Sequence, residues 1–263
     1  MRHATGSTTF STAGSTATTT VSRISPYLAA GMIGVRELWA DASDVYDAVH
    51  GRERKNVQKY RYELSWREHN YHLLYHNPDL AVANYVSFPN EIDWRDGNDA
   101  DADFEAWKAG ETGYPFVDAG MRQLEQEGYI HNRPRQNVAS FLTKHLLVDW
   151  REGARHFARK LIDHDPANNY GNWQWIASTG TDSVDVRIFD PVAQMSKYDD
   201  GATYVKEYVP ELRDVDADRI VDWLTLSAAG RRRLAPKYPD PIVDRNEAYE
   251  RAQRVFEEAL GKR

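Results

Sequence analysis

The stretch NRPRQNVASFLTKHLLVDWREG, residues 132–153, opens on basic and amide side chains and continues as an apolar pattern. Val138, Phe141, Leu142, His145 and Leu146 follow the spacing of one helix face, which predicts a helix that packs into a core. The two Arg and two Asn at its beginning indicate an anion site, because the first N–H groups of a helix lack partners and attract negative charge. Core packing with a buried Arg–Asp pair is the alternative for the same residues.

The next informative stretch, DHD at residues 163–165 and NNYGNWQW at residues 168–175, combines carboxylates, amides and indoles. Its two Asp can pair with the Arg side chains of the first stretch or accept hydrogen bonds from hydroxyls. On a helix, Asn169 and Trp173 lie one turn apart on one face, whereas Trp175 points elsewhere. Two indoles directed into different surroundings indicate two roles.

Helical periodicity dominates the rest of the chain, and the predicted fold class is all-α. One apolar stripe follows Pro115, which suits the first turn of a helix, and another follows the break at Pro239 and Pro241. Alternating strands joined by tight turns are missing from the sequence.

Two segments are predicted to lie outside this helical domain or to be loose within it. We expect residues 1–20 to be a flexible lead-in, because Ser, Thr, Gly and Ala dominate it and bury too little to offset the entropy of ordering. Residues 21–263 are then one helical domain. The acidic segment 93–103, which contains Gly97, predicts a second loose stretch.

Composition excludes several classes of protein. The chain has no Cys, which rules out disulfides, thiolate metal sites and cysteine nucleophiles, and fits a reducing cytoplasm. A net charge of −7 argues against a protein that coats DNA through bulk positive charge, but not against a local basic groove. No apolar run is long enough to predict a membrane span. Eight Trp and fifteen Tyr indicate either a large core or a role in stacking and redox chemistry.

Further motifs join these stretches: SRISP at 22–26, ELSWRE at 63–68, TGYP at 112–115, VDAGMR at 117–122 and STGTD at 178–182. From about residue 21 to the C-terminus, the motifs in this order closely resemble the flavin-binding domain of the photolyase/cryptochrome family. The resemblance implies a multi-helical, all-α domain that binds FAD noncovalently in a folded conformation. We expect the family's α/β antenna domain to be missing from this chain, and such a domain could be a partner on a separate chain.

The resemblance also implies which residues bind FAD. Asp163 and Arg135 match a pair that lies over the isoalloxazine, and Asn169 matches the residue that faces flavin N5, where an amide is typical of photolyases. Donors of the SRISP loop suit the oxygens of the diphosphate. The matched positions are Ser22, Arg23, Ile24, Ser25, Arg67, Asn132, Arg135, Asp163, Asp165 and Asn169.

Two further sets of positions match the family. Trp173, Trp150 and Trp94 match three tryptophans that pass electrons inward to photoreduce the flavin. The positions that match the substrate site are Glu63, which accepts hydrogen bonds from the damaged bases, Trp66 and Trp175, which wall the pocket, and Arg133 and Gln194 on the DNA-binding face. Taken alone, Glu63, Trp66 and Arg67 would fit an ordinary amphipathic helix.

The motifs are a mixture of two subgroups. Gln136 and the YGNW stretch at 170–173 are similar to DASH cryptochromes, which usually have Tyr where Trp175 stands. The WQW stretch at 173–175 and the STGTD motif are similar to photolyases that repair pyrimidine dimers.

The resemblance implies an FAD-dependent enzyme that uses blue light to repair cyclobutane pyrimidine dimers in single- or double-stranded DNA. Excited reduced flavin would donate an electron to a flipped-out dimer, the cyclobutane bonds would break, and the electron would return. Two alternatives stay open: a blue-light receptor of cryptochrome type, and a truncated remnant that binds flavin poorly. Glu63, Trp66 and Trp175 together favour repair.

Overall fold

The computed structural model describes residues 21–262, in which helices are joined by turns and loops and no strand occurs. The predicted lead-in, residues 1–20, lies outside the described residues. The helices are α1 (Ser25–Ala29), α2 (Val35–Ala48), α3 (Gly51–His76), α4 (Gly97–Ala109), α5 (Pro115–Glu127), α6 (Asn132–Ser140), α7 (Trp150–Lys160), α8 (Pro166–Ala177), α9 (Pro191–Tyr198), α10 (Thr203–Tyr208), α11 (Ala217–Val221), α12 (Ala228–Leu234) and α13 (Arg245–Ala259). Short helical turns are η2 (Pro78–Ala81), the π-helical turn η3 (Phe141–His145), η4 (Pro210–Leu212) and η5 (Trp223–Thr225). The predicted all-α fold is confirmed.

Carboxylates define where several of these helices begin. The side chains of Asp149, Asp165, Asp190 and Asp244 accept backbone N–H groups in the first turns of α7, α8, α9 and α13. Each occupies an N-cap, where an acceptor satisfies donors that the helix leaves free and a negative charge complements the helix dipole. Part of the chain's acidity is therefore structural.

Helix α5 forms the centre of the fold. Phe116 faces a hydrophobic cluster built from α9, α10 and the turns that follow, whereas Val117, Met121 and Leu124 face a second cluster from α4, α6, α7 and α8. Apolar residues thus cover α5 on both sides, and the apolar stripe predicted after Pro115 is confirmed as the core helix.

A fully buried carboxylate secures α5 to its surroundings. Asp118 accepts hydrogen bonds from the backbone N–H and hydroxyl of Thr112, at 2.8 and 2.6 Å, from the N–H of Gly113 at 3.0 Å, and from the hydroxyl of Tyr238. Burial raises the pKa of Asp118 although these hydrogen bonds act to lower it. Because every acceptor site is used, the polar group can remain in the core.

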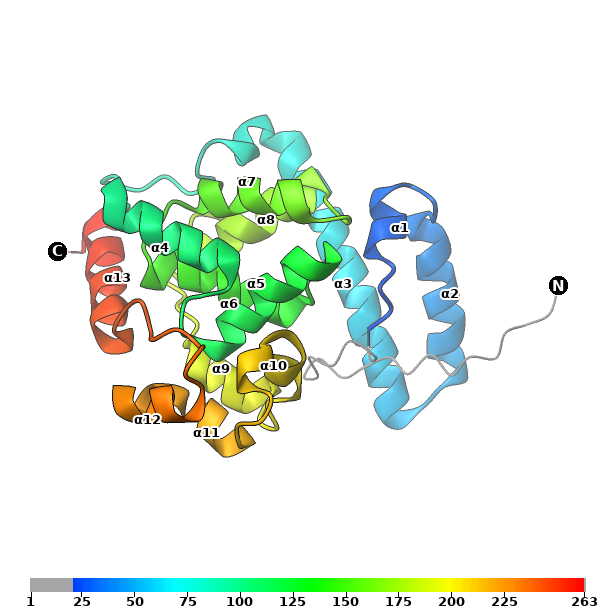
Figure 1. Cartoon of the computed structure of the whole chain (residues 1–263). Helices are drawn as coiled ribbons and strands as arrows, with labels where there is room; N and C mark the ends of the chain where they lie inside the picture. The colour runs from blue at the N-terminus through cyan, green and yellow to red at the C-terminus, as the bar shows by residue number, and fades with distance from the viewer. Residues whose placement is uncertain (1–20, 263) are drawn as a thin grey trace.

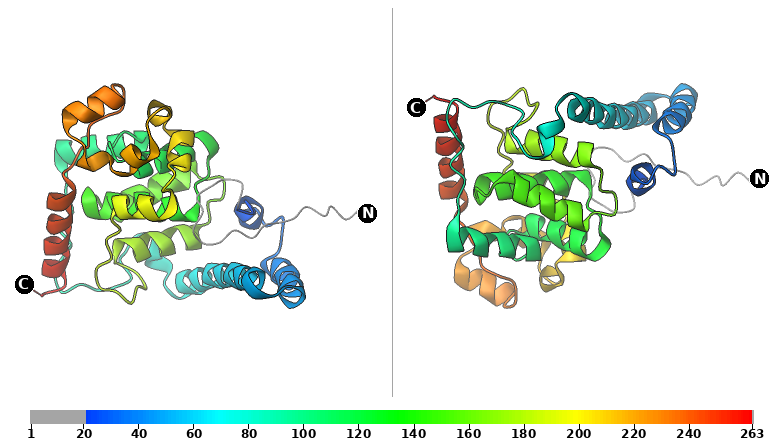
Figure 2. Two further views of the ribbon diagram at one scale, coloured as in Figure 1. Left: turned by 90° about the horizontal axis from the view of Figure 1, so that it is seen from below. Right: turned by 90° about the horizontal axis from the view of Figure 1, so that it is seen from above.

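The first three helices form a layer beside this body. In Figure 1, α1, α2 and the first half of α3 stand to one side, and α13 lies on the far side of the body. Both views in Figure 2 show the same separation. Helix α3 joins the two parts, because it packs on α2 and also on α8. The space between layer and body is where the site described below is found.

Most segment-level predictions agree with the structure, and one is only partly right. The stripe of residues 138–146 forms α6 and η3, and the stripe after the proline break forms α13. The predicted loose stretch 93–103 is only partly loose, because α4 begins at Gly97 and buries Ala100 and Trp107. None of the described helices combines the length and apolar character needed to cross a bilayer.

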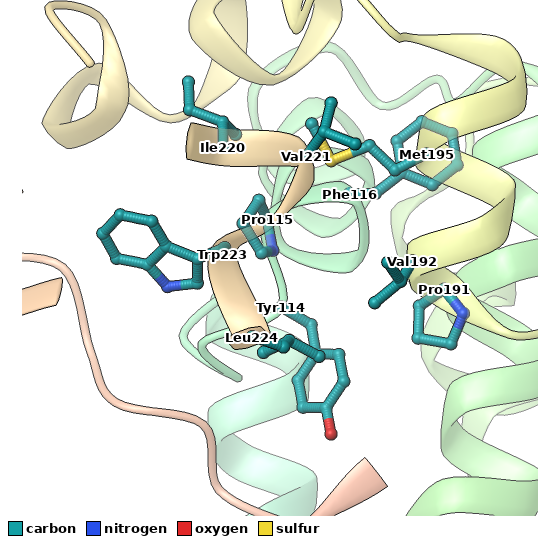
Figure 3. Close-up of a pocket in the computed structure, with 10 residues that line it drawn as sticks. All are labelled: Tyr114, Pro115, Phe116, Pro191, Val192, Met195, Ile220, Val221, Trp223 and Leu224. Atoms are coloured by element: carbon teal, nitrogen blue, oxygen red, sulfur yellow. The ribbon is translucent and has the colours of Figure 1, made fainter. Parts of the chain in front are cut away.

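The packing of α5 against α9 and η5 leaves one small apolar gap (Figure 3). Its volume is about 10 Å³, and its lining includes Tyr114, Phe116, Met195 and Trp223. A gap of this size barely admits a water molecule, which would also need polar partners. We interpret it as a packing defect and not as a ligand site.

One buried histidine links stability to pH. His145 in η3 is 1% exposed, neither ring nitrogen has a hydrogen-bond partner, and the ring stacks on Phe141 with centroids 5.1 Å apart. Burial lowers its pKa to about 4; Asp190 acts to raise it, whereas Arg245 and Arg251 act to lower it. The folded protein therefore holds this ring neutral.

We predict that the free energy of unfolding falls as the pH drops from 6.5 to 4, because the unfolded chain gains a proton on His145 that the folded chain excludes. This one residue accounts for about 1.4 kcal/mol per pH unit in that window. Urea unfolding followed by circular dichroism should show a shallower pH dependence for His145→Leu than for the parent. The exposed His72→Leu is the control, and equal slopes for His145→Leu and the parent would contradict the prediction.

Candidate functional site

A cavity of about 840 Å³ opens between the N-terminal layer and the body. It is lined by residues 21–25, 28 and 29, by one face of α3 between residues 56 and 70, by residues 129–136, and by the segment around the start of α8 with Thr181. Its volume lies toward the upper end of the roughly 300–1,000 Å³ of small-molecule sites, so it suits a large ligand.

The cavity brings together most of the predicted site residues, although they come from four separate segments. Those that line it are Ser22, Arg23, Ile24, Ser25, Glu63, Trp66, Arg67, Asn132, Arg133, Arg135, Asp163, Asp165 and Trp175. Asn169 and Gln194 do not line it, and neither do the three predicted electron-transfer tryptophans.

Helix α8 presents its faces to different surroundings. Asn168, Gly171, Asn172 and Trp175 line the cavity at the spacing of one helix face, whereas Trp173 is buried in the core. A Cβ on Gly171 would lie 2.4 Å from Oδ1 of Asn70, so glycine is needed for this close approach to α3. The prediction that the two indoles point into different surroundings is confirmed.

Asp163 is the most constrained polar group of the cavity. This carboxylate is 8% exposed and accepts hydrogen bonds from Nη2 of Arg135, at 3.2 and 3.3 Å, and from the hydroxyl of Ser25 at 2.7 Å. The predicted pairing of Arg135 with Asp163 is therefore present. Arg135 also donates to the carbonyl oxygen of Ile130, which fixes the guanidinium at the cavity wall.

Asp165 links α8 to α3. One of its oxygens caps α8 through the N–H of Asn168 at 3.0 Å, and the other lies 3.6 Å from the Arg67 guanidinium and accepts the hydroxyl of Tyr71. Arg67 also lies over the Tyr71 ring, 4.4 Å from its centroid. Tyr71 was missed by sequence reasoning, because it belongs to no motif and only the fold brings it to Asp165.

The loop 22–25 enters the cavity with a strained turn. Arg23 has φ of 49°, a left-handed conformation that is uncommon for a residue with a side chain. Its guanidinium pairs with Glu127 and lies 4.9 Å from the centroid of the Tyr129 ring. The Arg23 side chain is therefore committed to the body, and the Ser25 hydroxyl donates to Asp163, so the backbone N–H groups of this loop are its candidate donors toward a ligand.

His131 is a cavity residue that sequence reasoning missed. Its Nδ1 accepts the N–H of Arg133 and so caps α6, which leaves the proton on Nε2. Burial, with Arg133 and Arg135 nearby, lowers its pKa to about 4. A neutral ring that donates from Nε2 can therefore contribute to the cavity. The sequence contained one indication of this role, because His131 directly precedes the NRPRQN stretch and so occupies the N-cap of that helix.

Glu63 and Trp66 line the cavity and are exposed, so they mark an opening of the cavity to solvent, and the half-buried Trp175 lines the cavity as well. Trp66 is 38% exposed, and Glu63 pairs with Lys59 one turn earlier on α3. Arg187 lies 4.9 Å from the Trp175 ring centroid, a cation–π distance. Two indoles and one carboxylate acceptor thus line one cavity, and Glu63 and Trp66 lie where it opens to solvent.

Behind the cavity, Trp173 and Trp150 belong to one buried cluster, and Trp94 packs against it from a half-buried position. A Cβ on Gly153 would lie 2.2 Å from the Trp173 ring, so α7 can approach α8 here only because this residue is glycine. Trp150 precedes Gly153 by three residues and so lies on nearly the same face of α7. Trp107 also contacts Trp173, with ring centroids 6.3 Å apart, and no sequence motif singled it out.

Two predicted positions lie beside the cavity instead of lining it. Asn169 is 8% exposed and donates from its side-chain amide to the carbonyl of Ala154 at 3.0 Å. Gln194 on α9 lies 3.5 Å from the amide of Asn137 on α6. Their proposed contacts with flavin and with DNA stay predictions.

The donor set of the cavity fits a dinucleotide cofactor. N–H groups at 22–25 and at the start of α6 can meet phosphates, and Arg135 offers a positive charge at the wall of a partly apolar cavity. Asn168 and Asn172 add amides that can both donate and accept. Both the volume and the donors therefore suit FAD.

Comparison with known proteins agrees with this geometry. Residues 60–258 match the family described as the FAD binding domain of DNA photolyase. The chain is 51% identical over 242 residues to a deoxyribodipyrimidine photo-lyase of Halobacterium salinarum, covering 91% of this chain and 50% of the relative. A protein of the same name from Escherichia coli is 40% identical, with 90% and 49% covered. The chain spans about half the length of the curated relatives it matches.

Solved structures show the same fold. A bacterial class III photolyase from Agrobacterium tumefaciens has a TM-score of 0.84 at 40% identity, covering 93% of this chain and 50% of that one. A cryptochrome of Synechocystis has a TM-score of 0.81 at 32% identity, with 90% and 49% covered. Both similarities reach well beyond the motifs quoted above.

We predict that Arg135→Ala lowers the free energy of unfolding by about 3 kcal/mol, because it leaves the buried Asp163 carboxylate without its charged partner. Arg155→Ala is the matched control, since it breaks an exposed pair with Glu152 and should cost less than about 1 kcal/mol. Urea unfolding of the ligand-free protein measures both values. Equal losses for the two variants would show that the pair at Asp163 is not a buried constraint.

Proposed function

Because the chain belongs to the family of the FAD-binding domain of DNA photolyase, we propose that it acts in light-driven repair of pyrimidine dimers in DNA. Residues 21–263 would form one domain that holds both cofactor and lesion. The observation that carries the proposal is a cavity whose lining combines donors suited to a cofactor with two indoles, Trp66 and Trp175, and the carboxylate of Glu63.

FAD is the cofactor of this domain family, and when bound it supplies electron transfer under blue light. The residues of this chain hold and orient it. The backbone N–H groups of the loop at Ser22 and Ser25 would donate to phosphate oxygens, and Arg135, held by Asp163, would place a fixed positive charge at the wall of the cavity. The layer of α1–α3 closes the other side and excludes water.

The opening suits a base that has left the DNA stack. Trp66 and Trp175 offer faces for stacking, which is worth roughly 1–3 kcal/mol per base. Glu63 can accept hydrogen bonds from base N–H groups once its ion pair with Lys59 is broken. Extrusion is easier where stacking is already disturbed, so this opening would prefer damaged over intact DNA.

A chain of indoles supports electron supply from the surface. In this proposal Trp173 gives up an electron toward the cavity, Trp150 refills it, and Trp94 at the half-buried end takes an electron from an external reductant. The contact of Trp173 with Gly153, one turn from Trp150, supports the order of the first two.

The second candidate is a light receptor, and the similarity to a cryptochrome structure favours it. A receptor needs the same cofactor and the same indoles. It does not need the paired walls and the carboxylate at the opening, and their presence is why we prefer repair.

We predict that Trp173→Phe slows photoreduction of bound flavin at least tenfold, since phenylalanine keeps the apolar bulk but removes the readily oxidised indole. Trp107→Phe is the control, because it alters another buried indole of the same cluster that is not in the proposed chain. Absorption spectra under blue light with an external reductant measure the rate. Equal rates for Trp173→Phe and the parent would place the inner electron donor elsewhere.

A second prediction concerns repair itself. Reduced protein under blue light should remove dimers from an oligonucleotide, with no loss in the dark, and Trp66→Ala should weaken binding of that oligonucleotide by about one to two decades. The readouts are dimer content by chromatography and affinity by fluorescence anisotropy. Photoreduction without any repair, on single- or double-stranded substrate, would favour the light-receptor function instead.

A further inference from the structure

Helix α3 carries an exposed stripe that borders the cavity through Lys59 and Trp66 and continues from there toward the helix N-terminus. Its members follow one another at spacings of three or four residues, which places them on one side of the helix. The stripe consists of Arg52, Lys55, Lys59, Tyr62, Trp66 and His69, all of them exposed. We call this surface the α3 stripe.

The half of the α3 stripe next to the opening is aromatic. Tyr62 and His69 flank Trp66, with ring centroids 5.9 and 5.2 Å away and with planes nearly perpendicular to the indole. Tyr62 is 50% exposed, although a tyrosine ring is ordinarily drawn into a core or an interface. Tyr62 and His69, which do not line the cavity, therefore extend the aromatic surface of Trp66 along α3.

The other half of the stripe is cationic. Lys59 lies over the Tyr62 ring, 4.8 Å from its centroid, and Lys55 and Arg52 follow at successive turns. Helix α3 as a whole has six Lys and Arg side chains against three Glu, in a chain whose net charge is −7. A local positive surface on an acidic protein, next to a row of exposed rings, is complementary to a polyanion that carries flat bases.

We propose that the α3 stripe binds the unpaired nucleotides that flank the extruded lesion, with bases on Tyr62 and His69 and phosphates on Lys55 and Arg52. This inference rests on the proposed function, and it specifies the partner as single-stranded DNA. Bases in a duplex have their faces covered by their neighbours, so exposed side-chain rings can stack only on unpaired bases. The stripe spans about 25 Å of helix, which is enough for several nucleotides.

A simpler role for Tyr62 and His69 would be to hold Trp66 in place. The two roles differ in a double-mutant test, because a residue that acts only through Trp66 has no effect once Trp66 is removed. Tyr75 supplies the control: it is 79% exposed on the same helix, but nine residues after Trp66 it lies on the opposite side.

The experiment measures binding of undamaged, labelled oligothymidine to the flavin-free full chain by fluorescence anisotropy, so it needs neither light nor repair. Tyr62→Ala should weaken binding at least fivefold in both the parent and the Trp66→Ala background, whereas Tyr75→Ala should not. Lys55→Ala should reduce the slope of log affinity against log salt by about 0.7. Circular dichroism checks that each variant keeps its helices.

Three results would overturn the proposal. The first is that Tyr62→Ala causes no further loss of affinity for oligothymidine when Trp66 has already been replaced by Ala. The second is that Tyr75→Ala lowers this affinity as much as Tyr62→Ala does. The third is that a duplex of the same sequence binds as tightly as the single strand and that its binding also depends on Tyr62. Repair activity can succeed or fail independently of these results. A protein that repairs dimers but ignores Tyr62→Ala would retain the proposed function and lose this inference alone.

Discussion

The site depends on one buried carboxylate, because Asp163 joins three segments that are far apart in the chain. Asp163 itself lies in the turn that leads into α8. It accepts a hydrogen bond from the hydroxyl of Ser25 at the start of α1, and it pairs with the guanidinium of Arg135 on α6. A buried charge is tolerated only if it is paired and hydrogen-bonded, so these segments must arrive together. The same contacts that stabilise the fold therefore draw the N-terminal layer over the cavity.

Helix α8, which begins shortly after Asp163, positions further side chains of the site. At its start Asp165 caps the helix and binds Arg67 of α3; at its end the buried Lys144 donates to the carbonyl of Ala177 at 2.7 Å and to the hydroxyl of Ser178 at 3.1 Å. Because α8 is fixed at both ends, Trp175 lines the cavity and Trp173 packs in the core. Successive residues of a helix point in different directions, so α8 places Trp175, the proposed stacking residue, and Trp173, the proposed electron donor, on different faces.

Much of the fold could be predicted from the sequence because periodic apolar stripes are local signals. Helix α4 was missed over residues 97–103, since its buried Ala100 and Trp107 and its partly buried Phe104 lie among acidic residues, and Phe104 and Trp107 come only in its second half. Pairing between the Arg side chains of residues 132–153 and the Asp side chains of residues 163–165 was also predictable, because charges buried beside apolar stripes need partners, whereas the specific pair of Arg135 and Asp163 was implied by the resemblance to the family.

The rest of the site needed the three-dimensional structure. A shift of one residue turns a helical side chain by about 100°, and this decides that Asn168 and not Asn169 lines the cavity. Arg23 matches a cofactor-binding position of the family, yet its side chain pairs with Glu127. These two residues are far apart in the sequence, so the spacing of residues does not reveal this contact. Tyr71 likewise meets Asp165 only because α3 crosses α8.

The central claim is that the cavity of this chain holds FAD by its own residues, and one absorption spectrum tests it most directly. The purified protein is mixed with excess FAD, passed through a desalting column and scanned for the blue-absorbing band of oxidised flavin. The account predicts retention of about one FAD per chain, with the band reduced in Asp163→Ala. Colourless protein, with all of the flavin in the small-molecule fraction, would contradict it.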